Sequence, residues 1–205
     1  KKIKTDVVPV GAYKITQGDD VFYAEQVSIR VFAQRQQWQR WNASTNEMEK
    51  SVMTTSLNGD LQDSVGGFNL GRPSGYVEDW NALPEATKDL MRTVKRVKIF
   101  MGLLTVKSPI DEHGEPISKE YVDLPFVMDV KNRDSLKNLD GALKTVQRAN
   151  LLPIMSNLEL AGQEGSIPTG ATFGYITAKA GDKVELTEAD NQRSEERRVG
   201  KEGRS

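Results

Sequence analysis

The sequence predicts a β-rich α+β fold, either a small antiparallel barrel or a sandwich, with one main inserted helix. Segments rich in β-branched and aromatic residues recur along most of the chain, and short clusters of turn-forming residues separate them. Only one long segment, residues 134–150, repeats apolar residues at helical spacing. No internal repeat of fixed period is present, which argues against a solenoid or a propeller.

The first 57 residues are predicted to form strands. Val7–Ile15 and Val21–Trp41 are strand-like, and the turn cluster Gln17–Asp20 separates them. Asn42–Asn46 predicts a second turn, after which Ser51–Leu57 returns as a strand.

The middle of the chain combines a glycine-rich loop, a short helix and two strands. Gly66–Gly75 holds four glycines in ten residues, and loops of this kind are often functional or mobile. Pro84–Met91 predicts a helix with proline near its first turn. Val94–Lys107 and Tyr121–Lys131 predict strands, with a polar hairpin tip at Asp111–Glu115 between them.

The last part of the chain contains the main helix and the closing strands. Asp134–Asn150 carries an apolar stripe of Leu136, Leu139, Leu143 and Val146, and either Asp134 or Ser135 can cap its start. Closing strands are predicted at Asn157–Leu160, Ala171–Ala178 and Lys183–Leu186. The resulting five to eight strands suit a barrel of the oligonucleotide-binding type among other small barrels. We expect one domain over residues 1–192, with its core at about 20–187.

Composition argues against several kinds of site. The chain has no cysteine, which removes disulfides and thiolate metal sites and fits a reducing compartment such as the cytoplasm. The only histidine, His113, lies in the polar hairpin tip without a second histidine to share a metal. No apolar run is long enough to span a membrane. We therefore expect no cofactor, no metal, no membrane association and no enzymatic activity.

The last 13 residues, Arg193–Ser205, differ in character from the rest. They resemble the translation of a short-read sequencing adapter, with Gly203 where that translation has cysteine. The resemblance implies an environmental gene truncated near Gln192; a charged, disordered tail is the alternative. Neither interpretation gives these residues a function.

Two strands segregate basic and aromatic residues onto one face. Alternation along Ser28–Trp41 places Ile29, Val31 and Ala33 on a core face. The opposite face carries Arg30, Phe32, Gln34, Gln36, Trp38 and Arg40. In Val94–Val106 the corresponding face begins with Arg96, Lys98 and Phe100. Neither face contains an acidic residue, whereas Tyr121–Lys131 does not repeat the pattern.

This pattern is typical of a surface that binds single-stranded nucleic acid, because bases stack on aromatic rings and phosphates pair with cations. We expect stacking by Trp38, Trp41 and Phe100, and phosphate contacts by Arg30, Arg35, Arg40, Arg96 and Lys98. Trp41 and Arg35 stand at odd positions, on the opposite side of the strand from Trp38 and Arg40. They join this surface only if a bulge or the strand end rotates them. The alternatives are cross-strand pairing alone, or a second core layer that buries the rings.

The glycine-rich loop is a candidate phosphate cradle. Its main-chain amides and Arg72 could hold a phosphate, but it lacks the Gly-Lys-Ser/Thr ending of a P-loop. A flexible loop is the simpler interpretation, and folding over a bound strand with Arg72 on a phosphate is the weaker alternative.

The segment Arg35–Trp41, the Gly66–Gly75 loop and the helix after Arg133 together resemble uncharacterised proteins of environmental tailed phages. Within that group the chain is similar to phage single-stranded DNA-binding proteins of barrel type. The resemblance implies sequence-nonspecific binding of single-stranded DNA in phage replication or recombination, with replication proteins as partners and a homo-oligomer as one assembly. A phage structural or assembly protein is the alternative, and a metal-dependent nucleic-acid enzyme is a weaker one.

Overall fold

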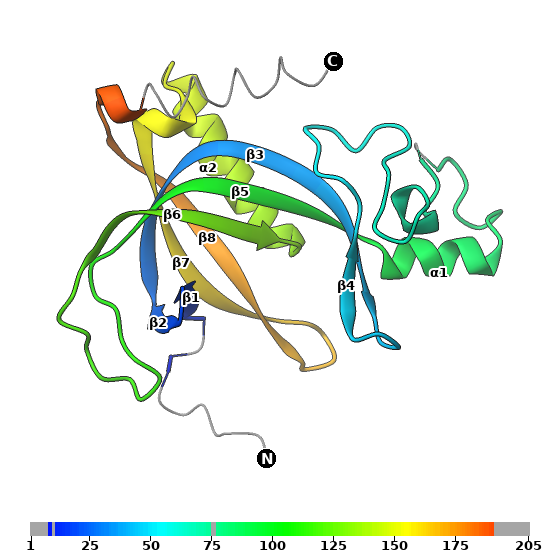
Figure 1. Ribbon diagram of the computed structural model, residues 1–205, viewed down its shortest axis with the longest axis horizontal. Helices are drawn as coiled ribbons and strands as arrows, with labels where there is room; N and C mark the ends of the chain where they lie inside the picture. Colours follow the sequence, from blue (N-terminus) through cyan, green and yellow to red (C-terminus); the bar gives the residue numbers. More distant parts are fainter. Residues whose placement is uncertain (1–7, 10, 75–76, 191–205) are drawn as a thin grey trace. The chain divides into compact units, whose positions relative to one another are not determined.

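The computed structural model describes residues 8–9, 11–74 and 77–190 (Figure 1). Its strands are β1 Tyr13–Gln17, β2 Asp20–Ala24, β3 Gln26–Asn42, β4 Glu47–Lys50, β5 Lys95–Val106, β6 Tyr121–Val130, β7 Ser156–Ser166 and β8 Thr172–Lys183. The α-helices are α1 Glu85–Thr93 and α2 Arg133–Arg148, and short 3₁₀ turns lie at η1 Asn69–Gly71 and η2 Pro153–Met155. The tail from Arg193 and the start of the first predicted strand, including Val7, lie outside the described residues.

The strands form two sheets. β1 and β2 make an antiparallel hairpin, and the larger sheet has the order β6-β5-β3-β7-β8. β4 pairs with the C-terminal end of β3, from Gln39 to Asn42. The prediction of a β-rich antiparallel fold with few helices is confirmed. The larger sheet begins at β6 and ends at β8 without closing into a barrel, so the oligonucleotide-binding type of barrel is not confirmed.

The chain folds into two compact units. The first contains the described residues up to Phe32, Met101–Phe126 and those from Asn132 onward. In this unit α2 packs on β7 and β8, which buries the predicted stripe residues Leu139, Leu143 and Val146. The second unit contains Ala33–Phe100 and Val127–Lys131. It therefore includes β4, α1 and the part of β3 from Ala33 onward.

The N-cap of helix α2 is neither of the two predicted residues and lies two residues before Asp134. Asn132 is the N-cap, and its side-chain oxygen accepts hydrogen bonds from the backbone N–H groups of Asp134 and Ser135. Ser135 is therefore inside the helix, where its hydroxyl accepts a hydrogen bond from the N–H of Ile176 in β8 at 2.9 Å. Asn138 donates to the carbonyl of Ile176 at 2.8 Å, so α2 satisfies both main-chain groups of this residue.

One predicted strand is displaced and one predicted turn lies inside a strand. The strand after the Asn42–Asn46 turn is β4, Glu47–Lys50, because the chain pairs with β3 immediately after the turn. In the predicted Ser51–Leu57 strand, only isolated bridges form at Ser51 and Thr54. The predicted turn at Gly181–Asp182 is instead part of β8, which absorbs it as an irregularity in its pairing with β7.

Candidate nucleic-acid interface

Trp38 is covered by an arginine from the glycine-rich loop. The Arg72 guanidinium lies over the Trp38 ring, 4.6 Å from the ring centroid. Its Nη1 also donates to the carbonyls of Met91 at 2.8 Å and Val94 at 3.4 Å. This positive charge stabilises the C-terminus of α1, where the helix dipole is negative. Burial lowers the pKa of Arg72. Arg72 and Trp38 therefore hold the loop and α1 on β3, and the expected contact of Arg72 with a phosphate is not available in this arrangement.

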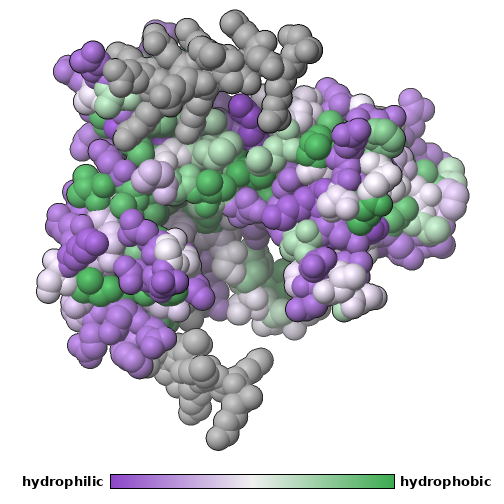
Figure 2. Space-filling view, viewed as in Figure 1, coloured by the Kyte–Doolittle hydropathy of each residue, from purple (hydrophilic) through white to green (hydrophobic). Residues whose placement is uncertain are grey.

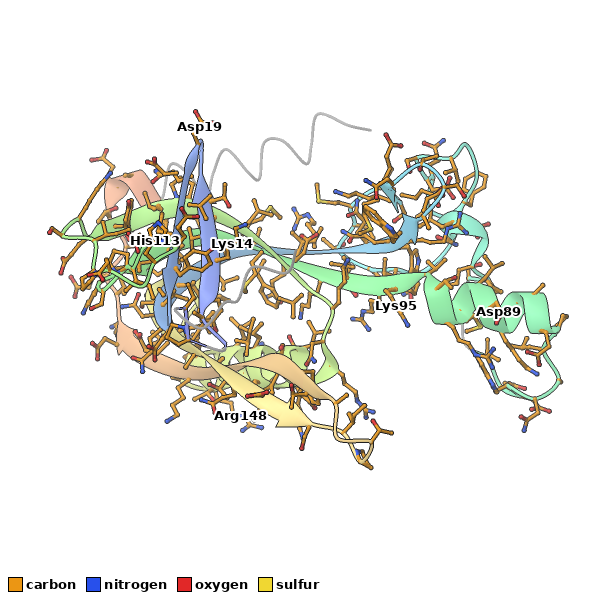
Figure 3. The ribbon with its side chains drawn as sticks, turned by 90° about the horizontal axis from the view of Figure 1, so that it is seen from below. Lys14, Asp19, Asp89, Lys95, His113 and Arg148 are labelled. Atoms are coloured by element: carbon orange, nitrogen blue, oxygen red, sulfur yellow. The ribbon has the colours of Figure 1, made fainter. Side chains whose placement is uncertain are left out.

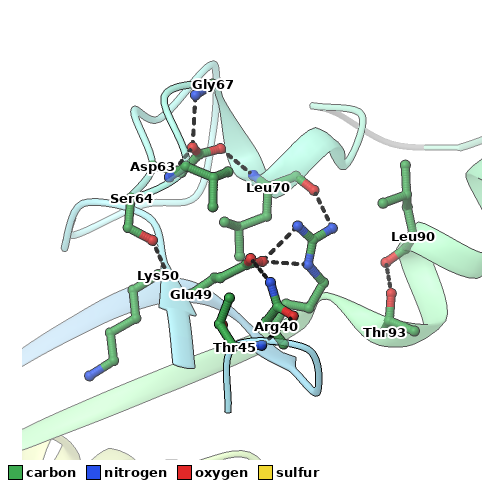
Figure 4. Close-up of polar contacts among 12 residues, drawn as sticks. Arg40, Thr45, Glu49, Lys50, Asp63, Ser64, Gly67, Leu70, Leu90 and Thr93 are labelled. Carbon is green, nitrogen blue, oxygen red and sulfur yellow. Dashed lines mark hydrogen bonds and ion pairs between the residues drawn. The ribbon is translucent and has the colours of Figure 1, made fainter. Parts of the chain in front are cut away.

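Arg40 is engaged by a buried carboxylate (Figure 4). Its Nη2 lies 2.6 Å from the Glu49 carboxylate across the β3–β4 ladder, and its Nη1 donates to the Leu70 carbonyl at 3.3 Å. Hydrogen bonds from Asn42 and then from Arg40 lower the pKa of Glu49. Glu49 therefore neutralises Arg40, which the sequence pattern predicted to contact a phosphate.

The glycine-rich loop is held from within by Asp63 (Figure 4). The Asp63 carboxylate accepts N–H bonds from Val65 at 3.1 Å, Gly67 at 2.8 Å and Leu70 at 2.7 Å. Burial, the largest influence, raises the pKa of Asp63, but these N–H donors outweigh it and the pKa is lowered. Asp63 thus occupies the main-chain amides that a phosphate would need. The cradle interpretation is wrong for this loop because its anion site already holds a carboxylate of the chain.

Two more predicted contact residues are buried. Arg30 is 7% exposed; its Nη2 pairs with Asp190 at 2.9 Å and its Nε donates to the Ile154 carbonyl at 3.1 Å. Phe100 is 0% exposed, because both faces of the middle of β5 are covered. The expectation that these two side chains project into solvent is therefore wrong. Alternation along a strand gives the direction of a side chain, but other parts of the chain cover both of these positions.

The remaining predicted residues retain different degrees of exposure. Trp41 is 53% exposed near the end of β3, opposite Met48 of β4, and Arg96 is exposed at the start of β5. Half-buried positions are taken by Phe32, Arg35 and Lys98. The Lys98 ammonium lies 5.3 Å from the Phe100 ring centroid. The predicted set is thus divided, and Trp41 and Arg96 are its most accessible members.

Sequence reasoning missed other exposed groups of the second unit. Phe68 and Trp80 are 54% and 40% exposed, and Arg92 lies 5.6 Å from the Trp80 ring centroid. Lys95 is an exposed neighbour of Arg96 and lies where β5 follows α1 (Figure 3). Phe68 and Trp80 lie in loops without strand alternation, so parity could not detect them; their signal was an aromatic residue among glycine and polar residues.

Hydrophobic residues also reach the surface among hydrophilic ones on the face shown in Figure 2. In the second unit, the exposed aliphatic side chains include Val52, Met53, Val65 and Val127. Exposed apolar groups of this kind suit contact with another protein.

The described residues contain no group of three or more acidic or histidine side chains that could hold a metal ion. None of their helices is long and apolar enough to cross a membrane. Comparison of the chain with protein-family models, with curated proteins and with solved structures finds no match.

Proposed function

We propose that this protein binds single-stranded nucleic acid, DNA in particular, without sequence preference through its second unit. The observation that carries the proposal is the exposed indole of Trp41 in the unit that also presents Lys95 and Arg96. Within the described residues neither cation forms an ion pair. An accessible ring can stack on a base of any sequence, and an accessible cation can pair with a phosphate.

The proposed contact set is smaller than the sequence pattern. Trp41 and Arg96 are its centre, and Arg35 and Lys98 of the same unit are secondary because they are half-buried. Arg30 and Phe32 are left out because they belong to the first unit. Trp38, Arg40 and Arg72 are left out because the contacts described above hold them, and Phe100 because it is buried. A place in phage replication or recombination, and a cytoplasmic location, rest on the resemblance and on composition alone.

Tryptophan fluorescence during titration with oligo-dT tests the stacking contact. The chain has three tryptophans, and we expect quenching to persist in Trp80→Phe and to diminish in Trp41→Phe. Trp41→Ala should weaken binding about 5- to 150-fold, the equivalent of one stacked base at roughly 1–3 kcal/mol. Equal affinity of Trp41→Ala and wild type at low salt would refute the site.

The phosphate contact is tested by the salt dependence of the same binding. Arg96→Gln should reduce the slope of log affinity against log salt by about 0.7, the value for one phosphate of a single strand. Lys144→Gln, which removes an exposed cation on α2 in the other unit, is the matched control and should leave the slope unchanged. Equal slopes for all three proteins would exclude Arg96 from the contact.

The second candidate function is assembly without nucleic acid. The exposed apolar side chains of the second unit favour it, because a protein interface would bury them. Sedimentation of the protein without DNA distinguishes the two functions. A stable oligomer that Met53→Lys dissociates, together with no response to oligo-dT, would favour assembly.

A further inference from the structure

The first unit has a groove on one face of the larger sheet, separate from the proposed nucleic-acid contact. Its volume is about 770 Å³, and β6, β5, β3, β7 and β8 all contribute lining residues. In β3 and β7 the lining residues include Ser28 and Glu159, and their neighbours Ile29 and Leu158 lie outside the lining and are buried. One face of this part of the sheet therefore forms core, whereas the other lines the groove.

The groove has an excess of negative charge. Carboxylates from four places in the chain line it: Glu25, Asp123, Glu159 and Asp182. The lining cations are Lys107 and Arg30, and Asp190 from outside the lining already pairs with Arg30 at 2.9 Å. Within the described residues none of the four carboxylates forms an ion pair. Nucleic acid is disfavoured on this face, and a cationic partner is favoured.

The arrangement of the carboxylates suits an extended cationic partner better than a single metal ion. The described residues hold no cluster able to bind a metal ion. Neighbouring strands lie about 4.8 Å apart, so five strands span about 19 Å, close to the length of six extended residues. Besides the carboxylates, the lining includes Gln26, Thr105 and Asn157, whose uncharged side chains can pair with a peptide main chain.

We infer that this groove is a docking site for an extended, lysine- or arginine-rich segment of a partner protein. The carboxylates of Glu25, Asp123 and Asp182 pair with its cations, while the uncharged side chains receive its main chain. Glu159 is held in place by a hydrogen bond from the Ser28 hydroxyl at 2.9 Å and supplies a fourth negative group.

Fluorescence anisotropy with a labelled Lys-Ala-Lys-Ala-Lys-Ala peptide tests the inference. We expect binding that weakens with salt, and no binding of the corresponding Glu-Ala peptide. Glu25→Gln, Asp123→Asn and Asp182→Asn should each weaken it about two- to fivefold, as expected for single exposed ion pairs. Asparagine tolerates the left-handed backbone of Asp123, whose φ is 54°, so that variant keeps the local conformation.

The matched control is Glu164→Gln, which removes an exposed carboxylate of β7 outside the groove lining. Unchanged affinity in this control, beside losses in the three groove variants, supports the site. Equal losses in all four variants would indicate attraction to net charge and overturn it, as would absence of peptide binding at low salt. Spermine that binds as tightly as the peptide would overturn the choice of a peptide. Oligo-dT binding is measured separately, so either proposal can fail alone.

Discussion

The ion pair between Arg30 and Asp190 gives the most demanding test of the structure. The two side chains are 8% and 3% exposed, and Asp190 also accepts the backbone N–H of Thr187. The Thr187 hydroxyl in turn accepts the N–H of Asp190 at 3.2 Å, a reciprocal capping arrangement. Asp190→Asn leaves the Arg30 charge buried without its anionic partner, with the Ile154 carbonyl as the remaining acceptor described for it.

Loss of one partner of a buried ion pair costs about 3–5 kcal/mol, which corresponds to a fall in Tm of about 6–20 °C for a chain of this size. We expect this decrease in the free energy of unfolding for Asp190→Asn, measured by urea titration and calorimetry. Asp89→Asn is the matched control, because Asp89 pairs with Arg92 at 2.9 Å on an exposed helix surface. Its cost should be about 0–1 kcal/mol.

A double variant separates the cost of leaving one charge buried and unpaired from the net contribution of the ion pair to stability. Arg30→Met combined with Asp190→Leu removes both charges and should recover most of the stability lost in Asp190→Asn. A cost below about 1 kcal/mol for Asp190→Asn would show that Arg30 has access to water or another anion, which contradicts the burial described here.

Four further perturbations test the second unit and the packing of two glycines. Asp63→Ala should cost about 2–3 kcal/mol in urea unfolding and accelerate hydrogen exchange at Gly67 and Leu70, because their N–H groups lose an anionic acceptor; unchanged exchange would exclude Asp63 as the anchor. The lowered pKa values of Glu49 and Asp63 stabilise the fold above the unfolded carboxyl pKa of about 4, and this contribution should disappear as pH falls through the lowered values; a Tm that does not fall on acidification would contradict it. Gly141→Ala should stabilise α2 by about 0.5–1 kcal/mol, since a Cβ there meets nothing within 4 Å. Gly102→Ala should destabilise strongly, since its Cβ would overlap the Arg30 carbonyl, and calorimetry of this glycine pair should show Tm changes of opposite sign.

The sequence alone determined most of the local structure. Helical spacing identified α2 and three of the four stripe residues that it buries, and β-branched runs with turn clusters identified β5 and β6 within a few residues. These predictions succeeded because the period of apolar residues is a local property that follows from backbone geometry. The same reasoning found the turn between β1 and β2 and the polar tip around His113. The predicted strand Val21–Trp41 is divided at Glu25 into β2 and β3.

Only the tertiary structure decided which members of the predicted site are accessible. Parity showed that Trp38 and Arg40 share a face of β3, but Arg72 and Leu70, about thirty residues later in the chain, cover that face. Likewise, Asp190 lies 160 residues from the cation that it neutralises. Alternation along a strand specifies direction, whereas exposure depends on what distant chain packs there, and that is a long-range property no local pattern contains.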